Sequence, residues 1–220
     1  MLQDGQKGAI IQRDRLTYAV APHVPCGIVS PDYLRKLAGV AEKYHAAAMK
    51  ITSAERIAIV GVKEEDIDAI WSALGVKPGA AVGLCVRSIK GCPGSTFCKR
   101  GVQDSIAMGM TLDSLYHGKQ VPGKLKMGVS GCANQCAETC IKDIALVGKK
   151  AGWDLLVGGN GGAKPRLSEK IADGLSDDAA KALIAKIMDY YCAGAQPHER
   201  LGRMIDRIGL KKLIADVISA

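Results

Sequence analysis

The first 78 residues alternate between the hydrophobic periods of strands and helices. In chain order the pattern predicts a strand, a helix, an extended stretch and a second helix, at 16–20, 31–44, 49–62 and 64–75. The first helix has the clearest start, because Ser30 is a good N-cap and Pro31 suits the first helical position. The extended stretch is expected to break near 53–55, and Gly75 to end the second helix. Residues 1–78 therefore predict a small α+β half-domain.

A second α+β pattern occupies residues 79–166. Strands are expected at 83–89, 124–130, 144–147 and 154–157. A helix is expected at 99–115. From Ser176 onward the apolar positions follow helical stripes over 180–191 and 201–208. We therefore expect 167–220 to be a helical C-terminal segment that packs on the core.

The composition is that of an ordinary globular chain of 220 residues, with 48% hydrophobic and 24% charged residues. No apolar run is long enough to span a bilayer, so no membrane association is expected. The N-terminal residues lack the apolar core of a signal peptide, which favours a cytoplasmic protein. In that compartment the eight cysteines are expected to stay reduced, and clustered ones to be metal ligands.

The net charge of +8 calls for an anionic partner. Aromatic residues make up only 4% and do not interleave with the basic ones, as stacking on bases would require. We therefore expect no nucleic acid, and favour a buried anionic ligand.

Two cysteine pairs carry the strongest chemical signal. Cys92 and Cys98 lie in CPGSTFC, and Cys132 and Cys136 in GCANQC, each pair directly after a predicted strand. Structural zinc usually takes pairs separated by two to four residues, whereas the wider first pair suits an iron–sulfur cluster. An iron–sulfur cluster, zinc and unrelated buried thiols all remain open from spacing alone. Of the other cysteines, Cys26, Cys85 and Cys192 are expected in the core. Cys140 is expected to share a helical face with Cys136.

The strand before the second pair alternates lysine with apolar residues. Lys124 and Lys126 therefore share one face, and Arg87 occupies the strand before the first pair. Solvated lysines on a half-exposed strand are one interpretation. The other is an oxyanion site, because we expect these cations and the thiols at the same end of the sheet.

These motifs resemble the sirohaem-dependent sulfite and nitrite reductases. The resemblance rests on the two cysteine spacings, on PGKLKMGVSGCANQC, and on five further segments: PCGIVSPDYLRKLAGVAEKY, VRSIKGCPG, DIALVG, GGNGG and HERLGRMIDRIG. It covers most of the chain. It implies a ferredoxin-like half-domain, then a sirohaem and [4Fe-4S] binding domain, then the helical segment.

The resemblance also implies residue roles. The four paired cysteines would hold the [4Fe-4S] cluster, and Cys136 would bridge it to sirohaem. Arg87, Lys124 and Lys126 would bind the substrate oxyanion. Further residues are assigned to the surroundings of the cofactor or to its carboxylates. They are Asn134, Gly159, Asn160, Gly161, Lys164 and Arg166.

One position departs from the family pattern. Where relatives usually carry another substrate arginine, this chain has Ala54, and Arg56 follows on the same face of a regular strand. Arg56 is thus a candidate substrate ligand, with a cofactor carboxylate or the solvent as its alternative partner.

The implied reaction is the six-electron reduction of sulfite to sulfide, with nitrite as a related substrate. Electrons would come from an external donor such as a ferredoxin or cytochrome, because the chain has no second set of closely spaced cysteines. It is about one repeat long, so a homodimer with shared sites and a monomer are both open. The alternative functions are an iron–sulfur electron carrier or cofactor-biosynthesis protein, and a zinc-stabilised nucleic-acid-binding module.

Overall fold

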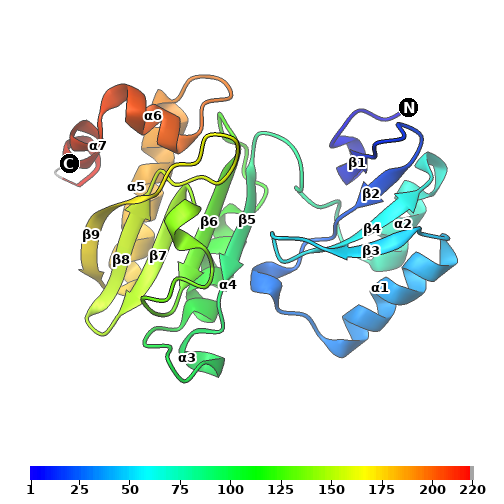
Figure 1. Cartoon of the computed structure of the whole chain (residues 1–220), viewed down its shortest axis with the longest axis horizontal. Helices are drawn as coiled ribbons and strands as arrows, with labels where there is room; N and C mark the ends of the chain where they lie inside the picture. Colours follow the sequence, from blue (N-terminus) through cyan, green and yellow to red (C-terminus); the bar gives the residue numbers. More distant parts are fainter. Residues whose placement is uncertain (219–220) are drawn as a thin grey trace. The chain divides into compact units, whose positions relative to one another are not determined.

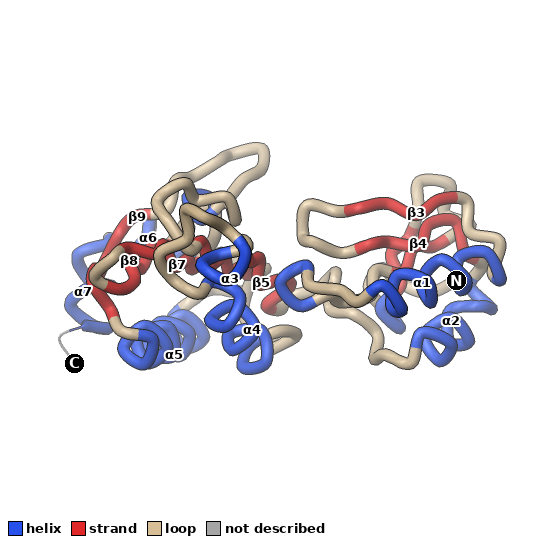
Figure 2. Tube along the Cα trace, turned by 90° about the horizontal axis from the view of Figure 1, so that it is seen from below, coloured by secondary structure: helices blue, strands red, loops and turns tan. Residues whose placement is uncertain are grey.

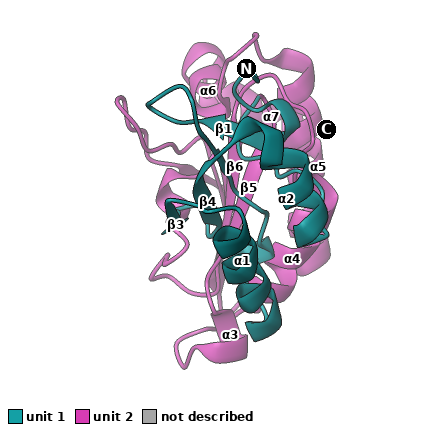
Figure 3. Ribbon diagram, turned by 90° about the vertical axis from the view of Figure 1, so that its right-hand side faces the viewer, with its two compact units in different colours: residues 1–83 teal, residues 84–220 magenta. Residues whose placement is uncertain are grey.

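The computed structural model describes residues 1–218 and divides the chain into two compact units. Unit 1 covers Met1–Gly83 and unit 2 covers Leu84–Ala220, of which the last two residues lie outside the described part (Figure 3). The sequence placed boundaries after residues 78 and 166. In the structure the cysteine loops and the C-terminal helices belong to one unit.

Unit 1 is an antiparallel sheet covered on one face by two helices (Figure 1). Its strands, in spatial order, are β1 (Ala9–Ile11), β2 (Tyr18–Val20), β4 (Ile57–Val62) and β3 (Ala48–Ile51). Its helices are α1 (Pro31–Lys43) and α2 (Ile67–Leu74). Leu37, Ile59, Ile70 and Trp71 meet in a core that is almost fully buried.

The helix boundaries of unit 1 follow the local signals. The Ser30 hydroxyl accepts a hydrogen bond from the Tyr33 backbone N–H at 3.1 Å, and Gly75 ends α2 with φ of 68°. The expected break between β3 and β4 is confirmed as a turn in which Glu55 has φ of 59°. The additional strand β1 was not predicted.

Unit 2 is built on a mixed five-stranded sheet. Its strands, in spatial as in chain order, are β5 (Val86–Gly91), β6 (Leu125–Ser130), β7 (Ile144–Lys149), β8 (Gly152–Val157) and β9 (Glu169–Leu175). β5, β6 and β7 are parallel, whereas β8 and β9 pair antiparallel. Because β5 and β6 are parallel, their carboxyl ends lie at the same edge of the sheet.

The helices of unit 2 are α3 (Gly94–Phe97), α4 (Ser105–Tyr116), α5 (Asp177–Gly194), α6 (Leu201–Ile208) and α7 (Leu210–Ile218). Figure 2 shows α4 and α5 on the same face of the sheet. Leu125, Met127 and Val129 of β6 are buried, and α4 packs on β5 and β6. The alternate residues of β6 therefore lie on the face opposite these helices.

Two sequence predictions fail in unit 2. The helix expected over 99–115 begins only at Ser105, because the Asp104 carboxylate caps it by accepting the N–H groups of Ile106 and Ala107. The segment expected to be helical from residue 167 begins with β9, whose mostly exposed residues pair with the edge of β8. Across the described residues, no helix is long and apolar enough to cross a membrane.

Candidate functional site

The two cysteine loops lie side by side at the carboxyl ends of β5 and β6. Cys92 follows β5 and Cys98 follows α3, while Cys132 begins the loop after β6. The loops are joined by hydrogen bonds: Gly131 N–H donates to Cys92 Sγ at 3.1 Å, and Val102 N–H to the Gly131 carbonyl at 2.8 Å. The predicted convergence of the two loops is therefore present in the fold.

Backbone contact between these loops requires glycine. A Cβ on Gly131 would lie 2.6 Å from the Gln103 carbonyl oxygen and 2.7 Å from Gly94 Cα, closer than real Cβ atoms approach. Gly94 itself has φ of 57°, which glycine adopts without strain. Close approach of the two main chains therefore depends on these glycines.

The thiols differ in exposure. Cys92 is buried beside the Ser105 hydroxyl, at 3.3 Å, whereas Cys98 and Cys132 are partly exposed and Cys136 is exposed. The Gly131 N–H and the Ser105 hydroxyl thus both lie within hydrogen-bond distance of Cys92 Sγ.

A zinc site would require a tighter arrangement. Tetrahedral zinc with Zn–S bonds of about 2.3 Å holds its sulfurs about 3.8 Å apart. In the described part of the chain, no three cysteine sulfurs lie within 4.8 Å of one another. The donor set of four thiols on two adjacent loops thus fits the wider cluster better than zinc.

The sheet face opposite α4 carries the predicted substrate cations. Lys124 immediately precedes β6, Lys126 is its second residue, and both are partly buried. Arg87 lies at a bulge, where the β5–β6 register shifts between Val86 and Ser88. A bulge adds one residue to its strand and re-aims the side chain there, which no hydrophobic pattern predicted.

The cations and the thiols do not lie at the same end of the sheet, contrary to the sequence prediction. Lys126 is near the amino end of β6, and the cysteines lie beyond its carboxyl end. The four residue steps from Lys126 to Ser130 span about 13 Å of strand. Every second side chain of a strand lies on the same face of the sheet, but these side chains are spread along the strand and do not all lie at one end of it.

Two further cations, missed from the sequence, lie near the predicted ones. Lys142 has its side chain almost fully buried, and its Cγ lies 2.8 Å from the position of a Cβ on Gly128, the residue that follows Lys126 on the same face. Arg200, directly before α6, forms a double hydrogen bond to Asp143, with Nε and Nη2 at 3.0 and 2.6 Å from the carboxylate.

The pKa values of the two lysines reflect this crowding. Burial lowers the pKa of Lys124, and Arg200 and Arg87 lower it further. Burial also lowers the pKa of Lys126, followed by the charges of Lys142 and Lys124. An anion placed here would relieve the repulsion and favour the charged lysines.

Two carboxylates partly balance these cations. Burial raises the pKa of Asp143, which the hydrogen bonds from Arg200 oppose, and Asp143 also accepts the Lys126 N–H at 2.8 Å. Glu138 contacts Lys142 at 2.9 Å and Lys90 at 3.3 Å, and the hydrogen bond from Lys142 lowers its pKa. Six cations (Arg87, Lys90, Lys124, Lys126, Lys142 and Arg200) against these two carboxylates leave a net positive face.

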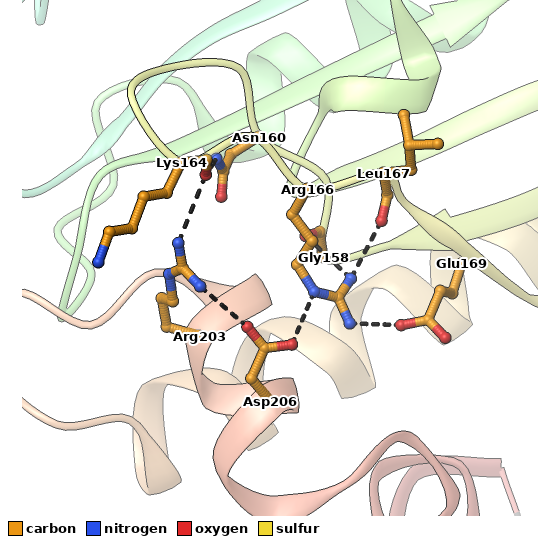
Figure 4. A network of polar contacts seen from close by, with 8 residues as sticks. All are labelled: Gly158, Asn160, Lys164, Arg166, Leu167, Glu169, Arg203 and Asp206. Carbon is orange, nitrogen blue, oxygen red and sulfur yellow. Dashed lines mark hydrogen bonds and ion pairs between the residues drawn. The ribbon is translucent and has the colours of Figure 1, made fainter.

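The predicted cofactor loop is an ordered turn (Figure 4). Asn160 and Arg166 pair through both backbone N–H groups at 2.9 Å, and Asn160 Nδ2 donates to the Lys164 carbonyl at 2.9 Å. The Gly159 N–H donates to the Lys142 carbonyl at 2.8 Å, which ties this loop to the cationic face. Gly161 and the Lys164 side chain are exposed.

Arg166 is occupied by contacts within the chain. Its guanidinium donates to Asp206 at 2.9 Å, to the carbonyls of Gly158 and Leu167 at 3.1 Å each, and to Glu169. Asp206 also pairs with Arg203 at 3.2 Å (Figure 4). These contacts give Arg166 a structural role in this turn, and its assignment to a cofactor carboxylate stays a prediction.

The remaining predicted site residues lie apart from this cluster of contacts. Asn134 is exposed within the second cysteine loop. Arg56 lies in unit 1, after the turn and not in a regular strand, so the expected alignment with Ala54 is wrong. It is buried, and its guanidinium lies 3.4 Å from the carbonyls of Ala21 and Ala80. Its contact with substrate stays a prediction.

The other cysteines were predicted with mixed success. Cys26 and Cys85 are buried, as expected, but Cys192 is exposed. It follows the buried Tyr191 by one residue, a rotation of about 100° around α5, which turns it to the solvent. Cys140 is partly exposed in a 3-10 turn and shares no helix with Cys136.

Four thiols on two adjacent loops, together with a cationic sheet face, are features that an iron–sulfur oxidoreductase acting on an anion requires. The chain matches two families of domains: the nitrite/sulfite reductase ferredoxin-like half domain over residues 10–76, and the nitrite and sulphite reductase 4Fe-4S domain over residues 82–220. The chain therefore belongs to the nitrite and sulphite reductase family of oxidoreductases. Membership implies a [4Fe-4S] cluster and sirohaem as its cofactors.

Individual relatives agree with this membership. The chain is 42% identical over 212 residues to an assimilatory-type sulfite reductase of Nitratidesulfovibrio vulgaris, covering 96% of this chain and 97% of the relative. It is 38% identical to a nitrite reductase [NAD(P)H] of Bacillus subtilis, covering 92% of this chain but only 25% of that much longer protein.

Solved structures share the fold. Dissimilatory sulfite reductase I superposes with a TM-score of 0.83 at 16% identity, covering 93% of this chain and 69% of the other. The NirA protein of Mycobacterium tuberculosis gives 0.80 at 19% identity, covering all of this chain and 44% of the other.

Proposed function

We propose that this protein is a sulfite reductase that converts sulfite to sulfide, with sirohaem bridged to a [4Fe-4S] cluster through Cys136. One observation carries the proposal: the adjacent parallel strands β5 and β6 present four thiols beyond their carboxyl ends and a cationic face along their length. The similarity to a sulfite reductase of nearly the same length supports sulfite over nitrite as substrate.

The reaction consumes six electrons and six protons for each bisulfite and releases hydrosulfide and three waters. When bound, the cofactors supply the electron transfer that no side chain provides. Cys92, Cys98, Cys132 and Cys136 would hold the cluster. What the chain itself adds is electrostatic.

Arg87, Lys124 and Lys126 would bind the oxyanion. Arginine offers a planar fork of donors, and lysine a compact charge with three donors, so together they match a pyramidal oxyanion. The lowered pKa values bring Lys124 and Lys126 closer to the range in which a lysine can return a proton to a leaving oxygen.

Absorption spectra of the anaerobically purified protein, together with iron analysis, test the assignment. We expect sirohaem bands and four cluster irons per chain, and loss of cluster iron in Cys98→Ser. The exposed Cys192 provides the control, because Cys192→Ser should keep every iron. A Cys98→Ser protein with an intact cluster would refute the ligand set, and a brown protein without sirohaem bands would favour an electron carrier.

Substrate binding is tested separately from cofactor binding. Lys126→Met should lower turnover of sulfite at least tenfold while the cofactor spectrum stays unchanged. Loss of sirohaem in this variant would instead assign Lys126 to the cofactor.

A further inference from the structure

The first cysteine loop exposes an unusual side chain. Phe97 is the only phenylalanine of the chain, and it ends α3 directly before Cys98. Its side chain is 74% exposed. A large aromatic group on the surface, covalently adjacent to a proposed cluster ligand, is typical of the apolar centre of a protein interface.

Exposed cations lie on the same loop and on a turn that contacts it. Lys99 and Arg100 follow Cys98, are exposed, and form no ion pair within residues 1–218. The turn between β7 and β8 lies beside the same loop, because Gln103 Nε2 donates to the Lys149 carbonyl at 2.8 Å. This turn adds the exposed residues Lys149 and Lys150.

Acidic groups nearby do not cancel these charges. Asp104 is engaged in capping α4 and accepts the Thr96 hydroxyl at 2.9 Å. Asp154 reaches Lys149 only at 4.0 Å. The surface therefore remains basic, with an apolar side chain among its charges.

We propose that these five residues, called here the donor patch (Phe97, Lys99, Arg100, Lys149 and Lys150), dock an acidic electron-carrier protein. The inference rests on the proposed function, which needs six single electrons for each sulfite. In each encounter one electron would pass from the reduced centre of the carrier to the cluster that these loops would hold, so the carrier would be oxidised by one electron and the cluster reduced by one.

Charge and position both select this class of partner. A carrier with an acidic surface is attracted by the exposed cations of the patch and oriented by them, which mainly accelerates association. Docking at α3 brings the carrier to the loop that holds Cys92 and Cys98, because Phe97 is covalently adjacent to Cys98. The exposed Phe97 then supplies apolar contact area beside these charges.

A reduced plant-type [2Fe-2S] ferredoxin, which is acidic, serves as the probe. With the holoenzyme, sulfite reduction is measured at increasing ferredoxin concentration, and in parallel with dithionite-reduced methyl viologen, a small cationic donor. Lys99→Glu and Arg100→Glu should each raise the ferredoxin KM about tenfold, and Phe97→Ala about fivefold. Turnover with methyl viologen and the cofactor spectrum should stay unchanged.

The control reverses a charge elsewhere in unit 2. Lys211 on α7 is exposed, and Lys211→Glu changes the net charge equally while leaving the donor patch intact. Its ferredoxin KM should move less than twofold. Raising the salt concentration should weaken ferredoxin-driven turnover of the wild type and have little effect on the Lys99→Glu variant.

Two results would overturn the inference, and both differ from failure of the proposed function. Equal ferredoxin KM values in the patch variants and in Lys211→Glu would show that donors dock elsewhere. Loss of methyl viologen turnover or of cluster iron in Phe97→Ala would show that Phe97 packs against the cofactor. Failure of the sulfite reductase assignment would instead appear as no sulfite reduction by the wild type with either donor.

Discussion

The ion pair between Arg200 and Asp143 fixes the start of β7 to the segment before α6. Asp143 is fully buried, and Arg200 is mostly buried, with 17% of its side chain exposed. Replacing Arg200 by Met keeps much of the aliphatic volume, but within residues 1–218 it leaves the buried carboxylate with the Lys126 N–H as its one hydrogen-bond donor. Breaking a buried pair by removal of one partner costs roughly 3–5 kcal/mol, and partial exposure places this case near 3 kcal/mol.

The expected loss has a pH dependence of known sign. Burial already raises the pKa of Asp143, and removal of Arg200 raises it further. The ionised carboxylate therefore opposes folding of the variant above this raised pKa, and protonation relieves the penalty as the pH falls through it. The difference in unfolding free energy between wild type and Arg200→Met should be largest at alkaline pH and shrink as the pH falls through the raised pKa of Asp143.

Thermal unfolding followed by circular dichroism measures this effect. A loss of about 3 kcal/mol in a unit of this size lowers Tm by roughly 10 °C. Arg203→Met, three residues further on in α6, is the control, because Arg203 and Asp206 form an exposed pair expected to contribute at most about 1 kcal/mol. Equal Tm values for the two variants, or a Tm difference from wild type that does not shrink at low pH, would refute the reasoning.

Three further predictions follow from the site. Burial lowers the pKa of Lys124 and Lys126, so the affinity for sulfite should decline at a pH below 10.5, the pKa of an ordinary lysine. Lys126→Arg should move this decline to higher pH, and an unchanged pH profile in a sulfite titration would contradict the prediction. Gly131→Ala should displace the cysteine loops and lower cluster iron with the sheet intact, whereas Gly39→Ala, which has open space in α1, should keep all iron and gain about 0.5–1 kcal/mol; full iron in both would contradict it. If two copies share sites, mixing Cys136→Ser and Lys126→Met chains should regain activity that neither has, and a monomer in sedimentation would exclude this.

Local sequence signals predicted the parts of the fold that depend on neighbouring residues. Ser30 and Gly75 mark real helix ends, and the alternation through β6 correctly separates its lysines from its core residues. The two cysteine loops were predicted to converge because each follows a strand, and the strands are indeed parallel neighbours.

The other site residues could not be predicted because they depend on contacts between distant segments. Lys142 reaches the cationic face from the segment before β7, and Arg200 from the segment before α6. The one available signal was the charged pair Lys142 and Asp143 at the start of a strongly apolar strand, since a charge there must find a partner. The bulge at Arg87 leaves no trace in hydrophobic periodicity.

The adjacency of β5 and β6 also has a consequence for how the protein matures. The two cysteine loops are separated along the chain by α4, and they meet only when β5 and β6 have paired across this right-handed type of crossover. Such a non-local parallel pairing forms slowly, because the entropy cost of closing a long loop comes before the stabilising contacts between the strands form. A cluster delivered to the nascent chain would find one pair of thiols at a time, so folding of the sheet should precede cluster insertion.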